Sequence, residues 1–162
     1  ISTSPIKGTR PRGKTLAEDL RLKNELLNSE KDRAENVMIV DLLRNDIGRI
    51  CEFGSVEVEK LFDLEEHPSL FHLVSTVSGK LRDSVNFSDI LRATFPCGSI
   101  TGAPKIRTMR IIDQIETVSR GLSMGAIGFA ATKMLKGKRQ NLFDLNVAIR
   151  TMTIRGREAV FN

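Results

Sequence analysis

Two aromatic residue types are missing from this chain of 162 residues: it has no tryptophan and no tyrosine, and its eight aromatic residues are all phenylalanine. Proteins that bind single-stranded nucleic acid stack bases on aromatic side chains, so this shortage argues against such a function. The formal net charge is +5, but the basic residues are spread along the chain. The charge therefore favours small carboxylate or phosphate partners, or simply marks a solvated basic surface.

Cysteine is also scarce. Cys51 and Cys97 are far apart and form neither a CxxC motif nor a Cys/His zinc pattern. Two reduced thiols in a cytoplasmic protein are the simplest interpretation. The sequence has no apolar run long enough to span a bilayer, and the opening ISTSPIKG does not resemble a signal peptide. We therefore expect neither membrane insertion nor secretion.

The composition, 40% hydrophobic and 28% charged, is that of a globular domain with a core. The chain begins without methionine in a proline-bearing segment and ends at REAVFN, which reads as an unfinished strand. We expect a fragment of a longer protein.

Two helices are expected in the first third of the chain. Thr15 and Glu18 form a capping box, which predicts a helix over about 15–28. Ser29 is the expected N-cap of a second helix, and Gly48 fits its end. Apolar residues occupy nearly every side of this second helix, so we expect it to be deeply buried.

The remaining segments indicate strands and short helices. Residues 1–13 are expected to form a loop rich in proline and glycine. One helix ends before Pro96 and another starts at Pro104, while Gly137 and Gly156 suggest hairpin turns. Strands are predicted at about 55–64, 71–81, 124–135, 141–154 and 158–162. Helices followed by hairpins predict an α+β fold with a mostly antiparallel sheet.

The first candidate for chemistry is Lys7, in SPIKGTRPRG. Pro5 restricts the backbone before it, and Gly8 lets the chain turn or approach a ligand closely. A lysine held in this way can act as a nucleophile if its surroundings favour the neutral amine. The plain alternative is a solvated loop lysine.

Two further candidates lie on predicted elements. Glu35 shares a helical stripe with apolar residues, and a carboxylate there needs a partner, either Mg²⁺ or Lys31 one turn earlier. His72 lies on a predicted strand, where a lone histidine is more often a core residue than a catalyst.

The segment CGSITGAPK fails the phosphate-loop pattern, because Ala103 and Pro104 stand where glycine and lysine are required. Its backbone N–H groups could still hold an anion, or it could be a plain turn. Arg150 is expected on the apolar strand NVAIRTMTI, where a guanidinium pairs with a carboxylate of the protein or of a ligand.

Six blocks in this order resemble the chorismate-utilising enzyme family, from about Ser4 to the end of the chain: SPIKGTRPRG, KDRAENVMIVDLLRNDIGR, HLVSTVSGKL, FPCGSITGAPKIRTMRIIDQIE, GAIGF and AIRT. Members that make anthranilate typically have alanine at the position of Lys7. PIKGT is typical of the aminodeoxychorismate synthase branch, which serves folate and p-aminobenzoate synthesis. The resemblance implies a large α/β sandwich with two antiparallel sheets, of which this chain is a partial catalytic domain.

The resemblance also implies roles for individual residues. Lys7 matches a nucleophile that attacks C2 of chorismate as the C4 hydroxyl leaves, after which ammonia adds at C4 and displaces the lysine. Glu35 matches a glutamate that holds Mg²⁺ against the ring carboxylate. His72 matches a histidine near the leaving hydroxyl. A glutamine amidotransferase subunit would deliver the ammonia.

The remaining matched residues concern substrate binding. Ser99, Thr101 and Gly102 match the turn that binds the ring, and Lys105 belongs to the same block. Arg150 matches the arginine that holds the enolpyruvyl carboxylate.

The chain also departs from the family pattern. It lacks the glycine-rich strand, the glutamate-bearing helix and the N-terminal portion of the family domain, so we expect little activity from it alone. Anthranilate or isochorismate synthesis, or a non-catalytic fragment that binds anions or a partner, are the alternatives.

Overall fold

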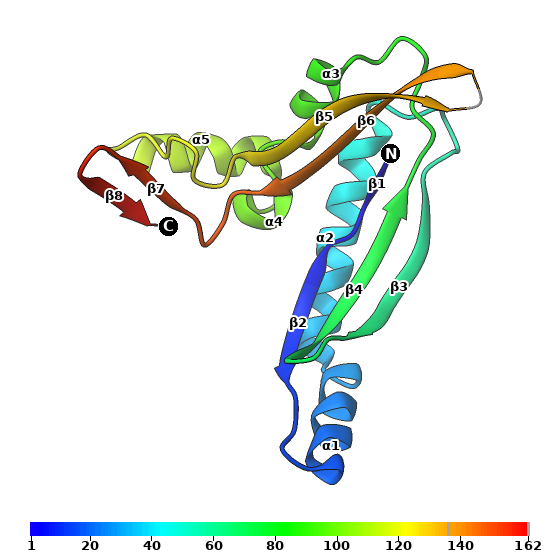
Figure 1. Cartoon of the computed structure of the whole chain (residues 1–162), viewed down its shortest axis with the longest axis vertical. Coiled ribbons are helices and arrows are strands. Elements are labelled where there is room, and N and C mark those ends of the chain that lie inside the picture. The colour runs from blue at the N-terminus through cyan, green and yellow to red at the C-terminus, as the bar shows by residue number, and fades with distance from the viewer. Residues whose placement is uncertain (136, 162) are drawn as a thin grey trace. The chain divides into compact units, whose positions relative to one another are not determined.

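A computed structural model describes residues 1–135 and 137–161. The chain forms two compact units, Ile1–Thr94 (unit 1) and Phe95–Asn162 (unit 2), and each is described by itself. Helices and antiparallel strands are mixed, which confirms the α+β expectation (Figure 1). Over the described ranges, the helices are too short or too polar to cross a bilayer.

A four-stranded antiparallel sheet forms the centre of unit 1, from β1 (Ser2–Thr3), β2 (Ile6–Pro11), β3 (Glu57–Glu66) and β4 (Leu70–Ser78). β4 pairs with β1 and β2 along one edge and with β3 along the other. The prediction of a loop over residues 1–13 is therefore wrong. Prolines are tolerated here because β1 and β2 are short edge strands.

Helices α1 (Leu16–Leu27) and α2 (Glu30–Gly48) follow the sheet's first two strands, and α2 lies along one face of the sheet (Figure 1). Their starts match the predictions: Thr15 Oγ1 accepts from the Glu18 N–H, and Ser29 Oγ accepts from the Asp32 N–H, both at 3.2 Å. The end of α2 at Gly48 is also confirmed.

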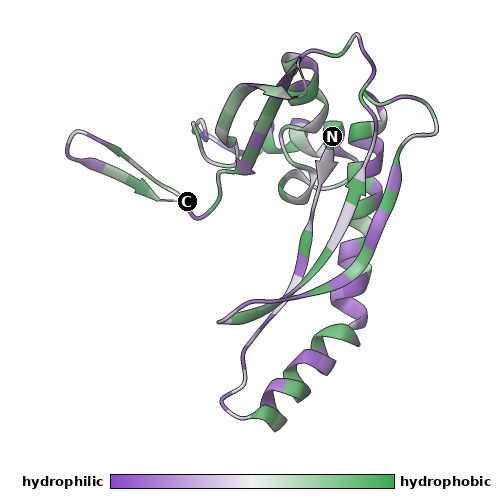
Figure 2. Ribbon diagram, turned by 45° about the vertical axis from the view of Figure 1, so that its right-hand side comes forward, coloured by the Kyte–Doolittle hydropathy of each residue, from purple (hydrophilic) through white to green (hydrophobic). Residues whose placement is uncertain are grey.

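The expected burial of α2 on nearly all sides is wrong in the described chain. Ile39, Leu43 and Ile47 are buried, whereas Val37 and Met38 are about half exposed. Figure 2 shows both hydrophilic and hydrophobic residues along this helix, as expected of a helix that buries one face.

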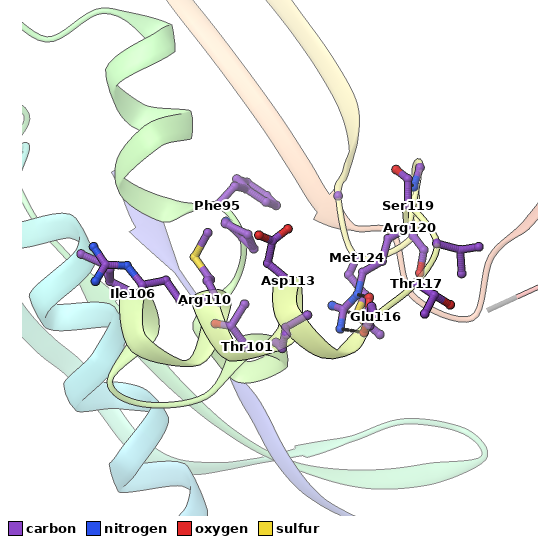
Figure 3. A pocket seen from close by; sticks show the side chains of 17 residues that line it. Phe95, Thr101, Ile106, Arg110, Asp113, Glu116, Thr117, Ser119, Arg120 and Met124 are labelled. Carbon is purple, nitrogen blue, oxygen red and sulfur yellow. Dashed lines mark hydrogen bonds and ion pairs between the residues drawn. The ribbon is translucent and has the colours of Figure 1, made fainter.

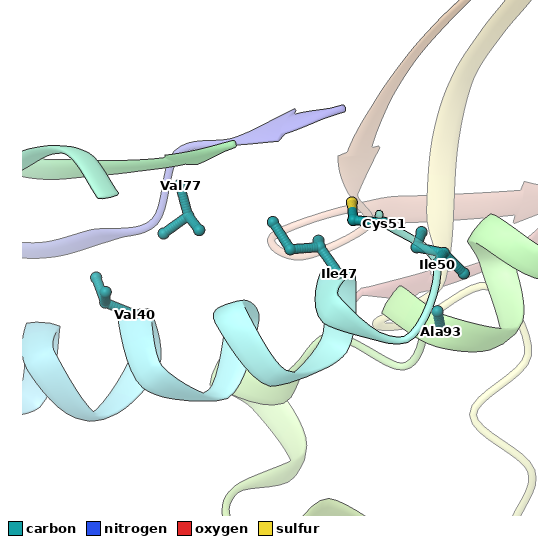
Figure 4. Packing of buried hydrophobic residues seen from close by; sticks show 6 residues of the cluster. All are labelled: Val40, Ile47, Ile50, Cys51, Val77 and Ala93. Atoms are coloured by element: carbon teal, nitrogen blue, oxygen red, sulfur yellow. The ribbon is translucent and has the colours of Figure 1, made fainter. Parts of the chain in front are cut away.

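Two apolar clusters hold unit 1 together. The first joins α2 to β4 and to the segments after them, through Val40, Ile47, Ile50, Cys51, Val77 and Ala93 (Figure 4). The second joins α1 to β4 through Leu26, Phe71 and Leu73. Both clusters use alternate residues of β4, so one face of this strand is fixed against the helices.

The later elements are α3 (Phe87–Thr94) in unit 1 and, in unit 2, α4 (Gly98–Thr101), α5 (Lys105–Ile115), β5 (Ala126–Leu135), β6 (Lys138–Val147), β7 (Met152–Arg155) and β8 (Glu158–Phe161). β5 pairs with β6 and β7 with β8, each antiparallel. The predicted turns at Gly137 and Gly156 are confirmed, since both have positive φ and connect paired strands. Asn162 of the last predicted strand lies outside the described residues.

One predicted strand is interrupted. The run expected over 141–154 divides into β6 and β7, and Arg150 lies in the connection with a φ of 50°. β6 ends at Val147 and β7 begins at Met152, so neither strand includes Arg150. The expectation that Arg150 lies on a strand is therefore wrong.

Candidate functional site

Lys7 lies in a β-bulge of β2. Ile6 pairs with Val74 and Thr9 pairs with His72, so two residues of β2, Lys7 and Gly8, oppose the single Leu73 of β4. A bulge breaks the ladder locally and redirects the side chains of the bulged strand. Lys7 is partly buried, which differs from the solvated loop lysine of the plain interpretation.

The bulge requires glycine at position 8. Gly8 has a φ of 92°, and a Cβ there would lie 2.8 Å from Leu26 Cδ1 and 3.0 Å from the Cβ and Cγ atoms of Asp32. An L-residue is strained at this φ, and its Cβ would overlap both helices. The backbone beside Lys7 is therefore in direct contact with α1 and α2.

The side chains of Thr9 and His67 lie beside His72. Its Nδ1 lies 2.9 Å from Thr9 Oγ1, across the β2–β4 pair. The ring of His67 meets it edge-on, with 5.5 Å between centroids, and Nε2 of His67 lies 3.3 Å from Glu65 Oε2. His72 is thus oriented by a hydroxyl on the strand that carries Lys7, and it is not a core histidine.

Glu35 is partly exposed on α2, and Lys31 Nζ lies 4.0 Å from its Oε1. A carboxylate oxygen is a ligand that Mg²⁺ prefers, so Glu35 fits a magnesium site as one donor. Within residues 1–135 and 137–161, no three His, Cys, Asp or Glu side chains gather as a metal-binding group.

The segment CGSITGAPK forms a helical turn instead of an open loop. Thr101 is buried, and its hydroxyl donates to the Cys97 carbonyl at 3.3 Å. Ser99 is exposed, with its Oγ 3.2 Å from Cys97 Sγ. Gly102 has a φ of 97° and ends α4, with its N–H donating to the Gly98 carbonyl.

Arg150 and Lys105 differ in their exposure. Arg150 is exposed in the β6–β7 connection, whereas Lys105 is buried at the start of α5. Because Arg150 lies between β6 and β7, strand alternation does not determine the direction of its side chain.

A pocket of about 930 Å³ lies within unit 2, between α5 and the segment that follows it (Figure 3). Phe95, Ile106 and Met109 give it an apolar lining, and Thr101 reaches it. Glu116 and Arg120 form a two-fold hydrogen-bonded ion pair that lowers the pKa of Glu116. Sequence reasoning missed this pocket, because its lining comes from ordinary helix and loop residues.

The predicted site residues are divided between the units: unit 1 holds Lys7, Glu35 and His72, and unit 2 holds Ser99, Thr101, Gly102 and Arg150. In unit 1, β2 contacts both β4 and α2, which joins the three elements concerned. The structure does not bring Glu35 and His72 together directly. α2 packs on the face of β4 that carries Ser75 and Val77, and alternation turns His72 away from that face.

Sequence reasoning missed Thr9, which contacts the candidate His72. It also missed Asp32, which pairs with Arg10, and Ser75, which donates to Asn36. Thr9 and Asp32 contact their partners across 63 and 22 residues of sequence, and local patterns do not report such contacts.

Comparison with known proteins gives a consistent result. The family model for "chorismate binding enzyme" matches residues 1–162. The chain is 46% identical over 158 residues to anthranilate synthase component 1 of Aquifex aeolicus, covering 98% of this chain and 31% of the relative. It is 50% identical over 153 residues to aminodeoxychorismate synthase component 1 of Escherichia coli, covering 94% and 32%.

A crystal structure of anthranilate synthase component I from Streptococcus pneumoniae superposes with a TM-score of 0.73 at 43% identity, covering 93% of this chain and 31% of that one. The chain thus spans about a third of the length of these relatives. The match over its whole length shows that the chain belongs to the chorismate binding enzyme family.

Proposed function

We propose that this chain carries the lysine-dependent chemistry of an aminodeoxychorismate synthase component 1. The observation that carries the proposal is the position of Lys7 in a bulge of β2, on the strand whose Thr9 contacts His72. Bulges occur often beside active sites, where they redirect a side chain. Relatives named for aminodeoxychorismate and for anthranilate synthesis are similar in identity, so the lysine distinguishes the two activities here.

In the proposed reaction, the neutral amine of Lys7 attacks C2 of chorismate, and the conjugated ring double bonds shift as the C4 hydroxyl leaves. His72 gives a proton to that hydroxyl, which leaves as water. Ammonia then forms a bond at C4, the double bonds shift back, and the C2–N bond to Lys7 breaks, which releases the neutral amine. The ammonium formed at C4 returns a proton to His72. The product is 4-amino-4-deoxychorismate, and the enzyme is regenerated.

The other predicted site residues are proposed to hold the substrate. Arg150 would bind the enolpyruvyl carboxylate through a guanidinium fork, and Ser99, Thr101 and Gly102 would bind the ring. Bound Mg²⁺ would neutralise the ring carboxylate, with Glu35 as one of its protein ligands. Oriented binding of this kind contributes much of the rate of such reactions.

We further propose that a glutamine amidotransferase subunit supplies the ammonia, in a cytoplasmic pathway to p-aminobenzoate and folate. The component 1 names of the relatives support a second component.

The test replaces the matching segment of the Escherichia coli aminodeoxychorismate synthase component 1 with this chain. The hybrid receives chorismate, Mg²⁺ and ammonia, and chromatography with mass spectrometry identifies the product. We expect aminodeoxychorismate, and Lys7→Ala should reduce its formation by about two orders of magnitude or more, because the covalent route is lost.

The unmodified Escherichia coli enzyme is the control for assay conditions. Anthranilate with release of pyruvate, or isochorismate, would assign the chain to another activity of the family. Undiminished aminodeoxychorismate formation by Lys7→Ala would remove the covalent role.

A further inference from the structure

We infer that Asp32, acting through Arg10, is a positioning residue that fixes the bulge carrying Lys7 against α2. The inference rests on the proposed function of Lys7, because it concerns where that amine is held. Asp32 lies in the first turn of α2, three residues before Glu35.

The first part of the argument is contact. The backbone of Gly8 approaches Asp32 so closely that a Cβ on Gly8 would lie 3.0 Å from two of its atoms. Lys7 immediately precedes Gly8 in the bulge. The side chain of Asp32 therefore forms part of the surface on which the bulge is seated.

The second part is charge. Arg10, two residues beyond the bulge, donates from Nη2 to Asp32 Oδ2 at 3.2 Å and from Nε to Glu25 Oε1 at 2.8 Å. Its side chain is 25% exposed and that of Asp32 is 17% exposed. Ion pairs sheltered to this degree are less screened than surface pairs. Arg10 thus ties β2 to both α1 and α2.

The third part is that the first turn of α2 holds Asp32 in place. The Asp32 N–H donates to the N-cap hydroxyl of Ser29, which fixes the first turn of α2. Residues three apart on a helix are neighbours on its surface, so Asp32 and Glu35 lie on the same side of α2. The pair of Asp32 and Arg10 therefore sets the position of the Lys7 strand relative to the helix that carries Glu35.

The experiment uses the whole chain with its lysines reductively methylated with ¹³C, so that each amine gives an NMR resonance. Lys7→Arg assigns the Lys7 resonance, and Asp32→Ala and Asp32→Asn are compared with wild type. Asp41→Ala is the matched control, since Asp41 lies on the same helix and its side chain is 80% exposed.

We expect Asp32→Ala to shift or broaden the Lys7 resonance while those of Lys14 and Lys80 stay in place. Asp32→Asn keeps an acceptor for Arg10 and should give a smaller change, whereas Asp41→Ala should give none. If Asp32→Ala lowers the stability but leaves the Lys7 resonance unchanged, Asp32 has only a structural role. An unchanged Lys7 resonance in either folded Asp32 variant would overturn the inference, and Asp32→Asn supplies the comparison if Asp32→Ala does not fold.

A second readout separates this inference from the proposed function. In the hybrid enzyme described above, Asp32→Asn should lower the rate of product formation by about tenfold with a smaller change in KM, because a misplaced amine slows attack. A hybrid that makes no aminodeoxychorismate would contradict the proposed function, while the NMR comparison would still decide the role of Asp32.

Discussion

The hydroxyl of Ser75 donates a 2.6 Å hydrogen bond to Oδ1 of Asn36, and both side chains are completely buried. The same Ser75 oxygen accepts the Phe62 N–H at 3.1 Å, where β3 adopts a positive φ. One hydroxyl therefore links α2, β4 and the irregular part of β3.

Replacement of Ser75 by alanine should leave Asn36 and the Phe62 N–H without this partner in the interior. Unsatisfied buried groups reduce stability, so we expect a loss of about 1–3 kcal/mol in the free energy of unfolding, measured by urea denaturation. Ser78→Ala, on the same strand, should change it by less than about 0.5 kcal/mol. Equal effects of the two substitutions would show that the buried network contributes nothing.

The close approach of Gly8 to α1 and α2 can be tested by comparing it with a second glycine of similar φ. Gly54 has a φ of 77° with no atom within 4 Å of an added Cβ, whereas Gly8 would contact Leu26 and Asp32. Gly54→Ala should cost about 1 kcal/mol for backbone strain alone. Gly8→Ala should lower the free energy of unfolding by about 2 kcal/mol more than this, because its Cβ would overpack the contact with the helices. Urea denaturation measures both losses. Similar losses at the two positions would mean that β2 moves away from the helices at little cost.

The pair of Arg12 and Asp19 predicts an acid-sensitive stability. Arg12 donates to both oxygens of Asp19, at 2.8 and 2.6 Å, and the Gly13 N–H donates at 2.7 Å. Hydrogen bonding by Arg12 is the main reason that the pKa of Asp19 falls below its ordinary value of 3.8.

Because the folded-state pKa is lowered, this stabilisation is complete above the unfolded-state pKa and is lost as the pH falls through the folded value. We expect the free energy of unfolding to decrease on acidification below about pH 4. Asp19→Asn should flatten that part of the profile, measured by urea denaturation between pH 2.5 and pH 6, a range of about one to two units around the carboxyl pKa. Asp41→Asn should preserve the wild-type slope, and an unchanged slope in Asp19→Asn would refute the assignment.

Thr9 should control the orientation of the His72 ring. Thr9→Val keeps the shape of the side chain but removes the hydroxyl that lies 2.9 Å from Nδ1. We expect the ¹⁵N resonances of the His72 ring to move, because the hydrogen bond on one nitrogen influences which tautomer is populated. Thr3→Val on β1 should leave them in place. Unmoved His72 resonances in Thr9→Val would show that the ring is held by other contacts.

Local signals predicted much of this fold. Thr15, Ser29 and Gly48 delimit two helices as expected, because caps and stops act within one turn of the chain. The hairpin glycines at 137 and 156 are equally local. The candidate residues follow from their motifs, and all of them except Gly102 and Arg150 lie within a helix or strand.

Other features could not be read from local patterns. The bulge at Lys7 exists because β2 pairs with a strand more than sixty residues away in the sequence. A short segment with two prolines gives no local signal that predicts this pairing. Apolar residues occur before and after Arg150, at Ile149 and Met152, so the sequence pattern hides the left-handed residue between β6 and β7. The burial of α2 was overstated, because periodicity does not tell which neighbours are present.

The turn between β2 and α1 has a consequence for variation at Gly13. A Cβ on this residue would lie 2.2 Å from the Asp19 nitrogen, against backbone that cannot rotate away. A library of all substitutions at position 13, selected for folded protein, should therefore return glycine almost alone, while Lys14, which is exposed beside it, should accept many residue types. The connection between the strand that bears Lys7 and the first helix therefore accepts almost no residue other than glycine at position 13.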